Sequence, residues 1–408
     1  MTTVSRVRDD RGAVLVHVAF ALLALMAFSA FSIDYGVFWT SRRQAQNAAD
    51  GAALAGAVAL AYDDPTDRTD TGAAKQSAYG IGHSNAIWGQ EPGLALSDIT
   101  FPTCPDGTDD CIRVNVFRDA AHSNPLPMFF GQLFGMTSQN IRATATAQVG
   151  VGNTTLCLRP WAIPDAFDDV NHNGIFDLGV DIYTAPGPGG AGTGYNPEDD
   201  YGTALVVKND PHFQLSPGWF QPLDFGSGGS TYEKAILGCI NTPYGIGDDV
   251  PTETGNMQGP TQHGVADLIS LDPDAYFADG VIHNNCVDDH SCFKWVADDP
   301  SDPKTKFHKV ADPTALFNPR IVPIPVFDTA KYATDLGGST HPDIRITNIL
   351  GFFVEDPDNV TVAPPAGTPY DPKFDILGVI INAPSVYDAS NGTISPDAAF
   401  LVTIYLIR

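Results

Sequence analysis

Basic residues are scarce in this chain of 408 residues. Lysines and arginines number 22 against 48 aspartates and glutamates, so the formal net charge is −26. A surface with this acidic excess repels nucleic-acid phosphates and anionic lipid head groups, which excludes nucleic acid as a partner of the soluble part. A cation is the better candidate ligand.

The motifs of common enzymes and zinc sites are also missing. The sequence has no CxxC pair, no HExxH motif and no Ser/His/Asp spacing. The glycine-rich stretches 187–194 and 226–229 lack the strand–turn–helix context and the Lys-Ser/Thr pair that phosphate-binding loops require. We therefore predict that the protein is not an enzyme.

Residues 13–33 form a long apolar run without formal charge. This run has 21 residues, and at ~1.5 Å per residue a helix of this length covers the ~30 Å hydrocarbon core of a bilayer. A cleaved signal peptide is the alternative, but its apolar region would be shorter and a small-residue cleavage site would follow at once. Here Asp34, Tyr35 and Trp39 follow, so we predict a retained membrane anchor.

The basic residues around this run give a weak indication of its orientation. Three arginines precede the run and two, Arg42 and Arg43, follow it. The small excess on the N-terminal side favours a cytoplasmic N-terminus. We therefore predict a single-pass inner-membrane protein with its large C-terminal part outside the cytoplasm.

All the cysteines lie beyond the apolar run, and their number is even. In an exported chain this pattern predicts disulfides, although buried reduced thiols are an alternative. Close spacing suggests two local pairs, which leaves a third pair by elimination, and other pairings are possible. The suggested pairs are Cys104–Cys111, Cys286–Cys292 and Cys157–Cys239.

Small residues dominate the stretch that follows the apolar run. Alanines recur every fourth residue and form a stripe on one helix face. Such a stripe permits close approach of another helix or of a sheet. Two interpretations stay open: packing on the protein's own domain, or an assembly interface with other subunits formed by Ala45, Ala49, Ala53 and Ala57.

The remaining sequence predicts an α+β protein. Segments 112–116 and 141–149 alternate apolar or small residues with polar ones, as half-buried antiparallel strands do, and the apolar, aromatic segment 127–134 between them is expected to hold a short helix. A long N-terminal helix packed on a small antiparallel sheet is therefore expected. From residue 154 onward, glycine and proline recur every few residues, which predicts a β-rich domain with long loops. Its candidate strands are 204–208, 321–327, 344–354, 374–381 and 400–407.

The head of the chain resembles a known family. After the apolar run come Asp34, the pair Arg42-Arg43, Gln46 and the run Ala48-Ala49-Asp50-Gly51-Ala52-Ala53-Leu54-Ala55. This combination resembles the N-terminal segment of TadE/TadG-like proteins of Tad (tight adherence, Flp-type) pilus assembly, whose mark is an apolar span, an aspartate and a Q-x-A-A-D-A-A-A-L-A run. Segments 161–183, 216–223, 255–264 and 318–328 are similar to the extracytoplasmic part of TadG-related proteins. The resemblance implies a single-pass envelope protein with no catalytic residues to carry over.

The sequence departs from the prepilins of these systems in one respect. Prepilins are cut after a glycine and carry glutamate five residues later, whereas here Gly12 is followed by Ala13 and His17 stands in the glutamate position. A neutral histidine cannot supply the negative charge, so processing after Gly12 and use as a bulk filament subunit are not expected. The alternative is that His17 is a tolerated polar residue.

A metal-type loop is the strongest chemical signal in the soluble part. Calcium takes six to eight oxygen ligands, and the pattern D-x-[DN]-x-[DN]-G supplies side-chain oxygens at positions 1, 3 and 5 and a carbonyl at position 7. An Asx-turn loop that uses Asn and Gly only for backbone geometry is the alternative. We predict a structural Ca²⁺ site formed by Asp169, Asn171, Asn173, the carbonyl of Ile175, Asp177 and Asp181.

Together these features predict four parts: a cytoplasmic stub at 1–12, a transmembrane helix at 13–38, a pilin-like TadE/TadG-like module at 39–152 and a β-rich extracytoplasmic domain at 153–408. The predicted function is non-enzymatic: a bitopic membrane protein of a Tad/Flp-type pilus assembly or secretion system, acting in pilus biogenesis or anchoring beside other pilus-assembly proteins. One alternative is a calcium-dependent adhesin or pilus-tip module that binds a surface ligand. Another is a membrane-anchored hydrolase.

Overall fold

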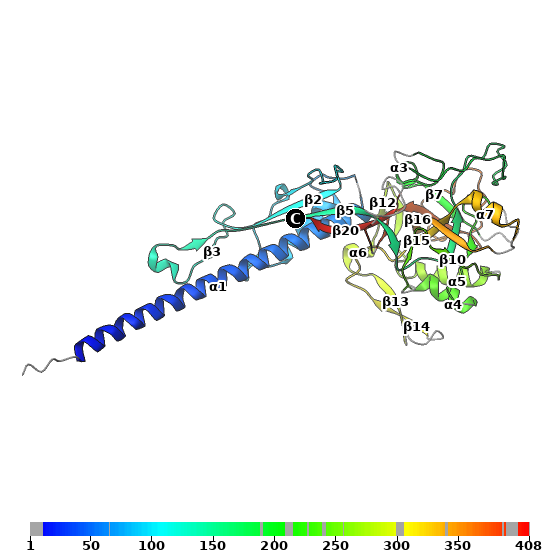
Figure 1. Ribbon diagram of the computed structural model, residues 1–408. Coiled ribbons are helices and arrows are strands. Elements are labelled where there is room, and N and C mark those ends of the chain that lie inside the picture. Colours follow the sequence, from blue (N-terminus) through cyan, green and yellow to red (C-terminus); the bar gives the residue numbers. More distant parts are fainter. Residues whose placement is uncertain are drawn as a thin grey trace, which may run out of the picture. The chain divides into compact units, whose positions relative to one another are not determined.

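The protein has two compact units, shown in a computed structural model (Figure 1). The first unit comprises residues 1–57, 68–148 and 406–408, and the second comprises 58–67 and 149–405. The long apolar helix and the β-rich C-terminal part confirm the predicted α+β class. The structure describes residues 11–64, 66–187, 191–208, 215–226, 228–238, 242–255, 257–298, 306–338, 342–385, 387–388 and 399–407.

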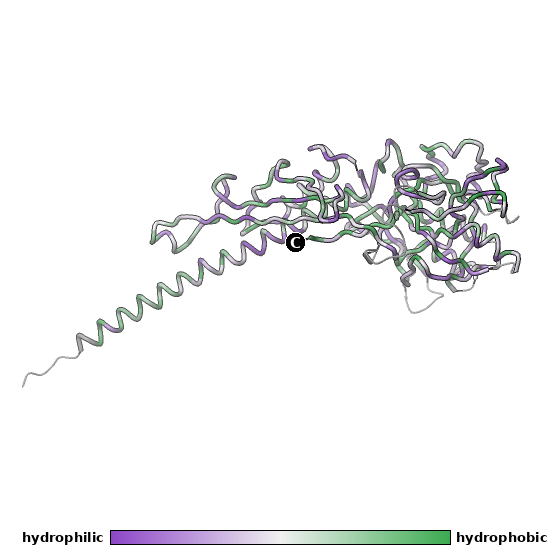
Figure 2. Tube along the Cα trace, turned by 45° about the horizontal axis from the view of Figure 1, so that its top comes forward, coloured by the Kyte–Doolittle hydropathy of each residue, from purple (hydrophilic) through white to green (hydrophobic). Residues whose placement is uncertain are grey.

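The first unit is built on one long helix, α1 (Arg11–Tyr62), whose last five residues belong to the second unit. No proline interrupts its sequence, so the backbone ladder can run unbroken. Hydrophobic residues occupy its N-terminal part (Figure 2). The described portion, Val14–Tyr62, is long and apolar enough to cross a membrane by length and composition, and its most apolar window is 0% buried.

A small antiparallel sheet accompanies α1 in the first unit. Strand β2 (Cys111–Arg118) pairs with β5 (Ile141–Thr155) from Cys111 opposite Gln148 to Arg118 opposite Ile141, and β1 (Ile99–Thr100) pairs with β2. The alternation predicted from sequence is present, because Ile112, Val114 and Val116 of β2 are all buried. The sheet therefore has one apolar face. Two short helices complete this part, α2 (Ala73–Ser84) and η1 (Leu96–Asp98).

A hairpin extends the first unit between β2 and β5. It consists of β3 (Leu126–Pro127), the 3₁₀ turn η2 (Gly131–Phe134) and β4 (Ser138–Gln139), with Leu126 opposite Gln139. Gly135 ends the turn with φ of 81°, a left-handed conformation that glycine adopts without strain. The short helix expected within 127–134 is this turn.

The second unit has a central sheet that is buried on both faces. Its order is β7-β17-β16-β15-β6-β8, with β10 also paired to β16; the β6–β15 pair is parallel, and the other pairs are antiparallel. Because both faces are covered, the main strands read as continuous apolar runs rather than as alternating ones. These strands are β6 (Trp161–Pro164), β7 (Ala204–Val207), β8 (Gln221–Pro222), β10 (Asp249–Val250), β15 (Ile321–Phe327), β16 (Ile344–Val354) and β17 (Ile376–Ile381).

Strand β15 contains two prolines inside this sheet. Pro323 lies opposite Gly351 of β16, and its carbonyl accepts a hydrogen bond from the backbone of Arg159 on the other side. A residue in a strand directs its N–H and C=O to the same side, so the missing N–H of Pro323 faces away from β16. The ladder to β16 is therefore intact despite the proline.

Two hydrophobic clusters fill the faces of this sheet. One includes Ile321, Phe327 and Tyr332, and the other includes Val322, Ile324 and Ile236. Helices α4 (Gly229–Leu237) and α5 (Gln258–Ile269) contribute to the second cluster, and α7 (Thr329–Asp335) contributes to the first. The remaining elements are α3 (Pro197–Asp200), β9 (Tyr244–Gly245), β11 (Tyr276–Ala278), β12 (Val281–His283), α6 (Cys286–Asp289), β13 (Phe293–Ala297), β14 (Phe307–Ala311), β18 (Ala383–Pro384), β19 (Tyr387–Asp388) and β20 (Leu401–Ile407).

Disulfides are present at both predicted local pairs. Cys104–Cys111 has a Cα–Cα distance of 5.4 Å, and Cys286–Cys292 has one of 4.8 Å. Cys157 is also disulfide-bonded, and its predicted partner Cys239 lies outside the described residues. The alternative of reduced thiols is therefore wrong for these five cysteines.

Candidate functional site

The alanine stripe of α1 packs within its own unit. Ala45, Ala49, Ala53 and Ala57 are each 0% exposed. Their surface is covered within the chain, which favours packing on the protein's own domain. The assembly interface with other subunits at these four residues stays a prediction.

Glycine allows the closest approach along this buried face. A Cβ atom built on Gly56 would lie 2.4 Å from Cδ1 of Ile112 in β2, and 3.0 Å from both the Ala74 carbonyl oxygen and the Ala78 Cβ in α2. Real Cβ atoms do not approach other atoms to 2.4 Å. At this point α1 is thus confined between the sheet and α2, and a side chain would fit only if Ile112 moved.

The polar residues of the α1 motif bind neighbouring backbone. The side chain of Gln44 accepts a hydrogen bond from the backbone N–H of Trp88 at 2.8 Å. Gln46 donates to the carboxylate of Asp50 at 2.7 Å and to the carbonyl of Thr144 in β5 at 3.3 Å. The bonds to Trp88 and Thr144 fix the rotation of α1 within the unit, because each joins a helix side chain to a backbone group outside α1.

Asp34 binds the turn of the hairpin. Its carboxylate accepts hydrogen bonds from three consecutive backbone N–H groups: Phe129 at 2.8 Å, Phe130 at 3.0 Å and Gly131 at 2.7 Å. An ionised carboxylate is a strong acceptor for such donors, and a bond of this kind contributes ~1.5–3 kcal/mol. Phe129 is half exposed, so water competes for its N–H group and lowers the contribution of this hydrogen bond to stability. The aspartate that follows the apolar run therefore fastens the hairpin to α1.

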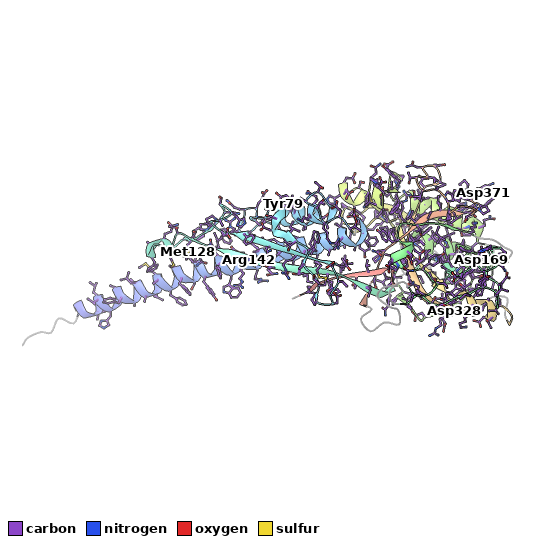
Figure 3. All side chains as sticks on the ribbon, turned by 90° about the horizontal axis from the view of Figure 1, so that it is seen from above. Tyr79, Met128, Arg142, Asp169, Asp328 and Asp371 are labelled. Carbon is purple, nitrogen blue, oxygen red and sulfur yellow. A yellow bond between two sulfur atoms is a disulfide. The ribbon has the colours of Figure 1, made fainter. Side chains whose placement is uncertain are left out.

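A groove lies between α1 and the hairpin. It has a volume of about 320 Å³ and is lined mainly by apolar groups of both elements. The hairpin residue Met128 lies close to α1 (Figure 3). The groove reaches from Phe38 down the helix to Ala27, so the hairpin extends beside the last part of the apolar run.

Large apolar side chains of the hairpin are exposed to solvent. Leu133 is 79% exposed, and Phe134 is 75% exposed. The sequence marks this stretch as apolar and aromatic, but it gives no sign that Asp34 binds it. Three more residues of the hairpin share this exposure: Phe129 at 53%, Phe130 at 36% and Met136 at 53%.

Aromatic residues form a ladder on the exposed side of α1. Phe31 and Tyr35 stack with a centroid distance of 5.6 Å, and Tyr35 and Trp39 meet edge to face at 6.1 Å. All three side chains are at least 48% exposed. Exposed aromatic residues at the end of an apolar helix are typical of the membrane–water boundary.

The predicted calcium residues lie together in one loop of the second unit. Asp169 accepts hydrogen bonds from the backbone N–H groups of Asn173 at 3.2 Å and of Gly174 at 2.7 Å. Both oxygens of Asp181 are engaged by the N–H groups of Val170 and Asp177. Asp181 thus closes the base of the loop, where the antiparallel bridge Asp168–Ile182 joins its ends.

The amide groups of the loop face Asp177. Asn171 and Asn173 both donate from their side-chain nitrogens to Oδ2 of Asp177, at 2.8 and 2.7 Å. The oxygen-rich donor set is of the kind that calcium prefers. These amides would have to rotate to present oxygen to a cation, and among the described residues no group of three or more His, Cys, Asp or Glu side chains is arranged to hold a metal. The calcium site stays a prediction.

Buried carboxylates occur elsewhere in the second unit. Asp165, at the end of β6, accepts hydrogen bonds from the N–H groups of Tyr195 and Ala166 and from the hydroxyl of Tyr183. Burial raises the pKa of Asp165 to about 7. Burial and the nearby Asp288 carboxylate raise the pKa of Asp63 to about 7 as well.

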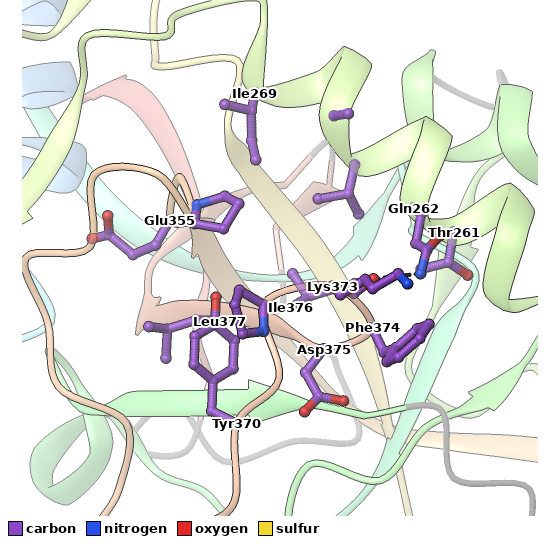
Figure 4. A pocket seen from close by; sticks show the side chains of 14 residues that line it. Thr261, Gln262, Ile269, Glu355, Tyr370, Lys373, Phe374, Asp375, Ile376 and Leu377 are labelled. Carbon is purple, nitrogen blue, oxygen red and sulfur yellow. Dashed lines mark hydrogen bonds between the residues drawn. The ribbon is translucent and has the colours of Figure 1, made fainter.

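A cavity of about 200 Å³ lies between α5 and the segment that leads into β17 (Figure 4). Gln262 donates to the backbone carbonyl of Lys373 across its rim. The carboxylates of Glu355 and Asp375 point in different directions, so the labelled lining residues do not converge on a reacting atom (Figure 4). This lining gives no catalytic arrangement of nucleophile and base.

The geometry defines a class of protein: one long apolar helix with an exposed span, joined to an α+β module and a β-rich unit. A family model described as putative Flp pilus-assembly TadE/G-like matches residues 12–59. This N-terminal segment is therefore TadE/G-like, which confirms the resemblance noted from its motif. No curated protein and no solved structure matches the chain.

Proposed function

We propose that this protein is a non-enzymatic, single-pass inner-membrane component of a Tad/Flp-type pilus assembly or secretion system, acting in pilus biogenesis or anchoring. Residues 13–38 of α1 cross the membrane, and the rest of the chain lies outside the cytoplasm. Its partners are other pilus-assembly proteins. The family match at residues 12–59 supports this assignment.

The observation that carries the proposal is the change along α1 from exposed large apolar residues to buried alanines. Large apolar residues such as Leu15 and Leu23 are 74% and 58% exposed, whereas Ala49 and Ala53 further along the same helix are fully buried. Exposing a continuous run of large apolar residues to water is unfavourable, and lipid removes this cost. The disulfides support an oxidising compartment for the remainder of the chain.

Membrane insertion is tested by placing charge in the exposed part of α1. Arginine near the centre of a membrane helix costs ~2.5–3.5 kcal/mol, so Leu23→Arg combined with Met26→Arg should move the protein out of the carbonate-resistant membrane fraction. Asn47→Arg, a matched change at an exposed position beyond the span, should leave fractionation unchanged. Retention of the double variant in the membrane would contradict the span.

Orientation and partners need separate measurements. Protease added to intact spheroplasts should degrade the chain beyond about residue 45 while a cytoplasmic marker stays whole. Pull-down from detergent-solubilised membranes should then recover pilus-assembly proteins. Protection of the C-terminal part would overturn the proposed orientation, and a pull-down without pilus components would overturn the assignment to pilus assembly.

We also propose that the loop 169–181 binds calcium as a structural ion. The supporting observation is the convergence of Asp169, Asn171, Asn173 and Asp177 in one loop closed by Asp181. Asp169 and Asp177 would supply charge, the two asparagines would rotate to supply oxygens, and the Ile175 carbonyl would complete the set.

Calcium binding to the folded state should raise the melting temperature of the full chain. At a calcium concentration 100 times the dissociation constant, the gain in stability is ~2.7 kcal/mol. Asp169→Ala should abolish the response to calcium, whereas Asp358→Asn, a change at an exposed aspartate outside the loop, should retain it. If metal-free wild-type protein melts at the same temperature with calcium and with chelator, the loop is an Asx-turn structure.

A further inference from the structure

We infer that the hairpin of residues 126–139 is a second membrane contact, which enters the lipid interface beside α1. This inference rests on the proposed membrane span. The partner is the lipid bilayer itself, at the boundary between head groups and acyl chains on the side where the apolar run ends.

The position of the hairpin follows from its attachment to α1. Asp34 holds the turn, and the groove between the two elements continues down the helix to Ala27. Ala27 precedes Ile33, the last residue of the apolar run, by six residues, which is ~9 Å along a helix. If α1 crosses the bilayer, the turn of the hairpin therefore lies at the depth of the outermost acyl carbons.

The composition of the hairpin suits that depth. No residue from 124 to 140 carries a formal charge. The large side chains that its turn exposes are mostly apolar, led by Leu133 and Phe134, and the exposed polar residues Gln132, Thr137 and Ser138 are uncharged. A protein-binding surface normally has a polar rim around an apolar centre, whereas this surface continues into the exposed apolar face of α1.

Backbone N–H groups of the hairpin have hydrogen-bond partners within the protein, as a site with little water requires. Irregular backbone at membrane depth is tolerated only where its polar groups find partners within the protein. Asp34 accepts from three N–H groups of the turn, and the N–H groups of Met128, Leu133 and Met136 donate to carbonyls inside the hairpin. The same bonds satisfy the carboxylate of Asp34 at the end of the apolar run.

The proposal is tested on the full chain in phospholipid nanodiscs. An environment-sensitive fluorophore (NBD) is attached to a cysteine introduced by Leu133→Cys, with Leu23→Cys in the span and Ala86→Cys, an exposed position of the first unit, as references. Quenching is measured with lipids that carry a nitroxide high on the acyl chain, and separately with aqueous iodide. The parent chain without an added cysteine must take up no label.

The proposal predicts that the label at Leu133 loses most of its emission to the shallow lipid nitroxide and is shielded from iodide. The label at Ala86 should respond to iodide alone. Iodide quenching at Leu133 as strong as at Ala86, with Leu23 quenched by lipid, would overturn the hairpin contact and leave the span intact. Shielding of Leu133 from both quenchers would also overturn it and indicate cover by a second copy or another protein. Absence of lipid quenching at Leu23 would overturn the proposed span as well.

A variant of Asp34, which binds the turn of the hairpin, gives an independent check. Asp34→Ala removes the acceptor of three N–H groups, so lipid quenching at Leu133 should fall and iodide quenching should rise. Asp50→Ala, a matched change in the same helix at a carboxylate that accepts from Gln46, should leave both signals unchanged. Unchanged quenching in Asp34→Ala would overturn the depth-setting role of Asp34.

Discussion

Along its alanine stripe in the first unit, α1 meets its neighbours through methyl groups and a glycine. The core of the second unit differs from this contact, because it buries ionisable side chains such as Asp165 and Arg320, which are 1% and 0% exposed. The guanidinium of Arg320 donates to the backbone carbonyls of Val354, Asp272 and Ala275. The comparison separates two kinds of sensitivity: the α1 contact should respond to the size of a side chain, and the second unit should respond to its charge.

The largest expected effect is a pH dependence in the second unit. The pKa of Asp165 rises from 3.8 to about 7 on folding because the carboxyl is buried. Its contribution to stability is therefore fully present below pH ~4 and is lost as pH rises through ~7. The free energy of unfolding of this unit should fall by on the order of a few kcal/mol between pH 5 and pH 8.

Asp165→Asn should flatten this pH dependence, because an amide does not ionise. The Asp63 carboxyl, whose pKa burial also raises to about 7, contributes in the same direction and accounts for a residual slope. Asp358→Asn, at an exposed position, serves as the control. Chemical denaturation of the full chain in detergent across this pH range checks the prediction, and an equal slope in wild type and Asp165→Asn would refute it.

The next effect concerns the size of side chains along α1. Ala53→Leu should destabilise the first unit by ~1–3 kcal/mol, because overpacking displaces a fully covered face. Asn47→Leu, on the exposed side of the same helix, should change its stability little. Hydrogen exchange in β2 and in residues 141–148 of β5 measures the first unit separately from the second. Normal protection of both strands in Ala53→Leu, with impaired recovery of pilus proteins, would favour the assembly-interface interpretation instead.

The main strands of the second unit could be predicted from the sequence. Segments 321–327 and 344–354 coincide with β15 and β16, because runs of Ile, Val and Phe bounded by turn residues specify strands that are covered on both faces. Helices α4 and α5 were not predicted. They are short, and α5 contains Gly259, Pro260 and Gly264, which weaken the helical pattern.

The candidate site could be predicted only in part. The sequence identifies Asp34 and an apolar segment at 127–134, but the bonds between them join residues 95 to 97 positions apart, and a single sequence carries no record of such contacts. The packing partner of the alanine stripe could not be predicted from the sequence either. Its spacing defines a smooth helix face, and a smooth face fits a sheet of its own domain as well as a helix of another subunit.

The smallest expected effect tests how closely α1 approaches β2. Gly→Ala in a helix interior normally stabilises by up to ~1 kcal/mol. Gly51→Ala should follow this rule, because its added Cβ would lie 3.6 Å from Ile81, an ordinary contact.

Gly56→Ala should reverse the sign and lower stability, because its Cβ would lie 2.4 Å from Ile112 and 3.0 Å from the Ala74 carbonyl oxygen. The Ile112 side chain can rotate, but the Ala74 carbonyl belongs to the backbone and yields less. A double variant, Gly56→Ala with Ile112→Val, should recover part of the loss by removing the Cδ1 atom. Equal stabilisation by Gly51→Ala and Gly56→Ala would mean that α1 and β2 are too far apart for a Cβ atom at residue 56 to clash with Ile112.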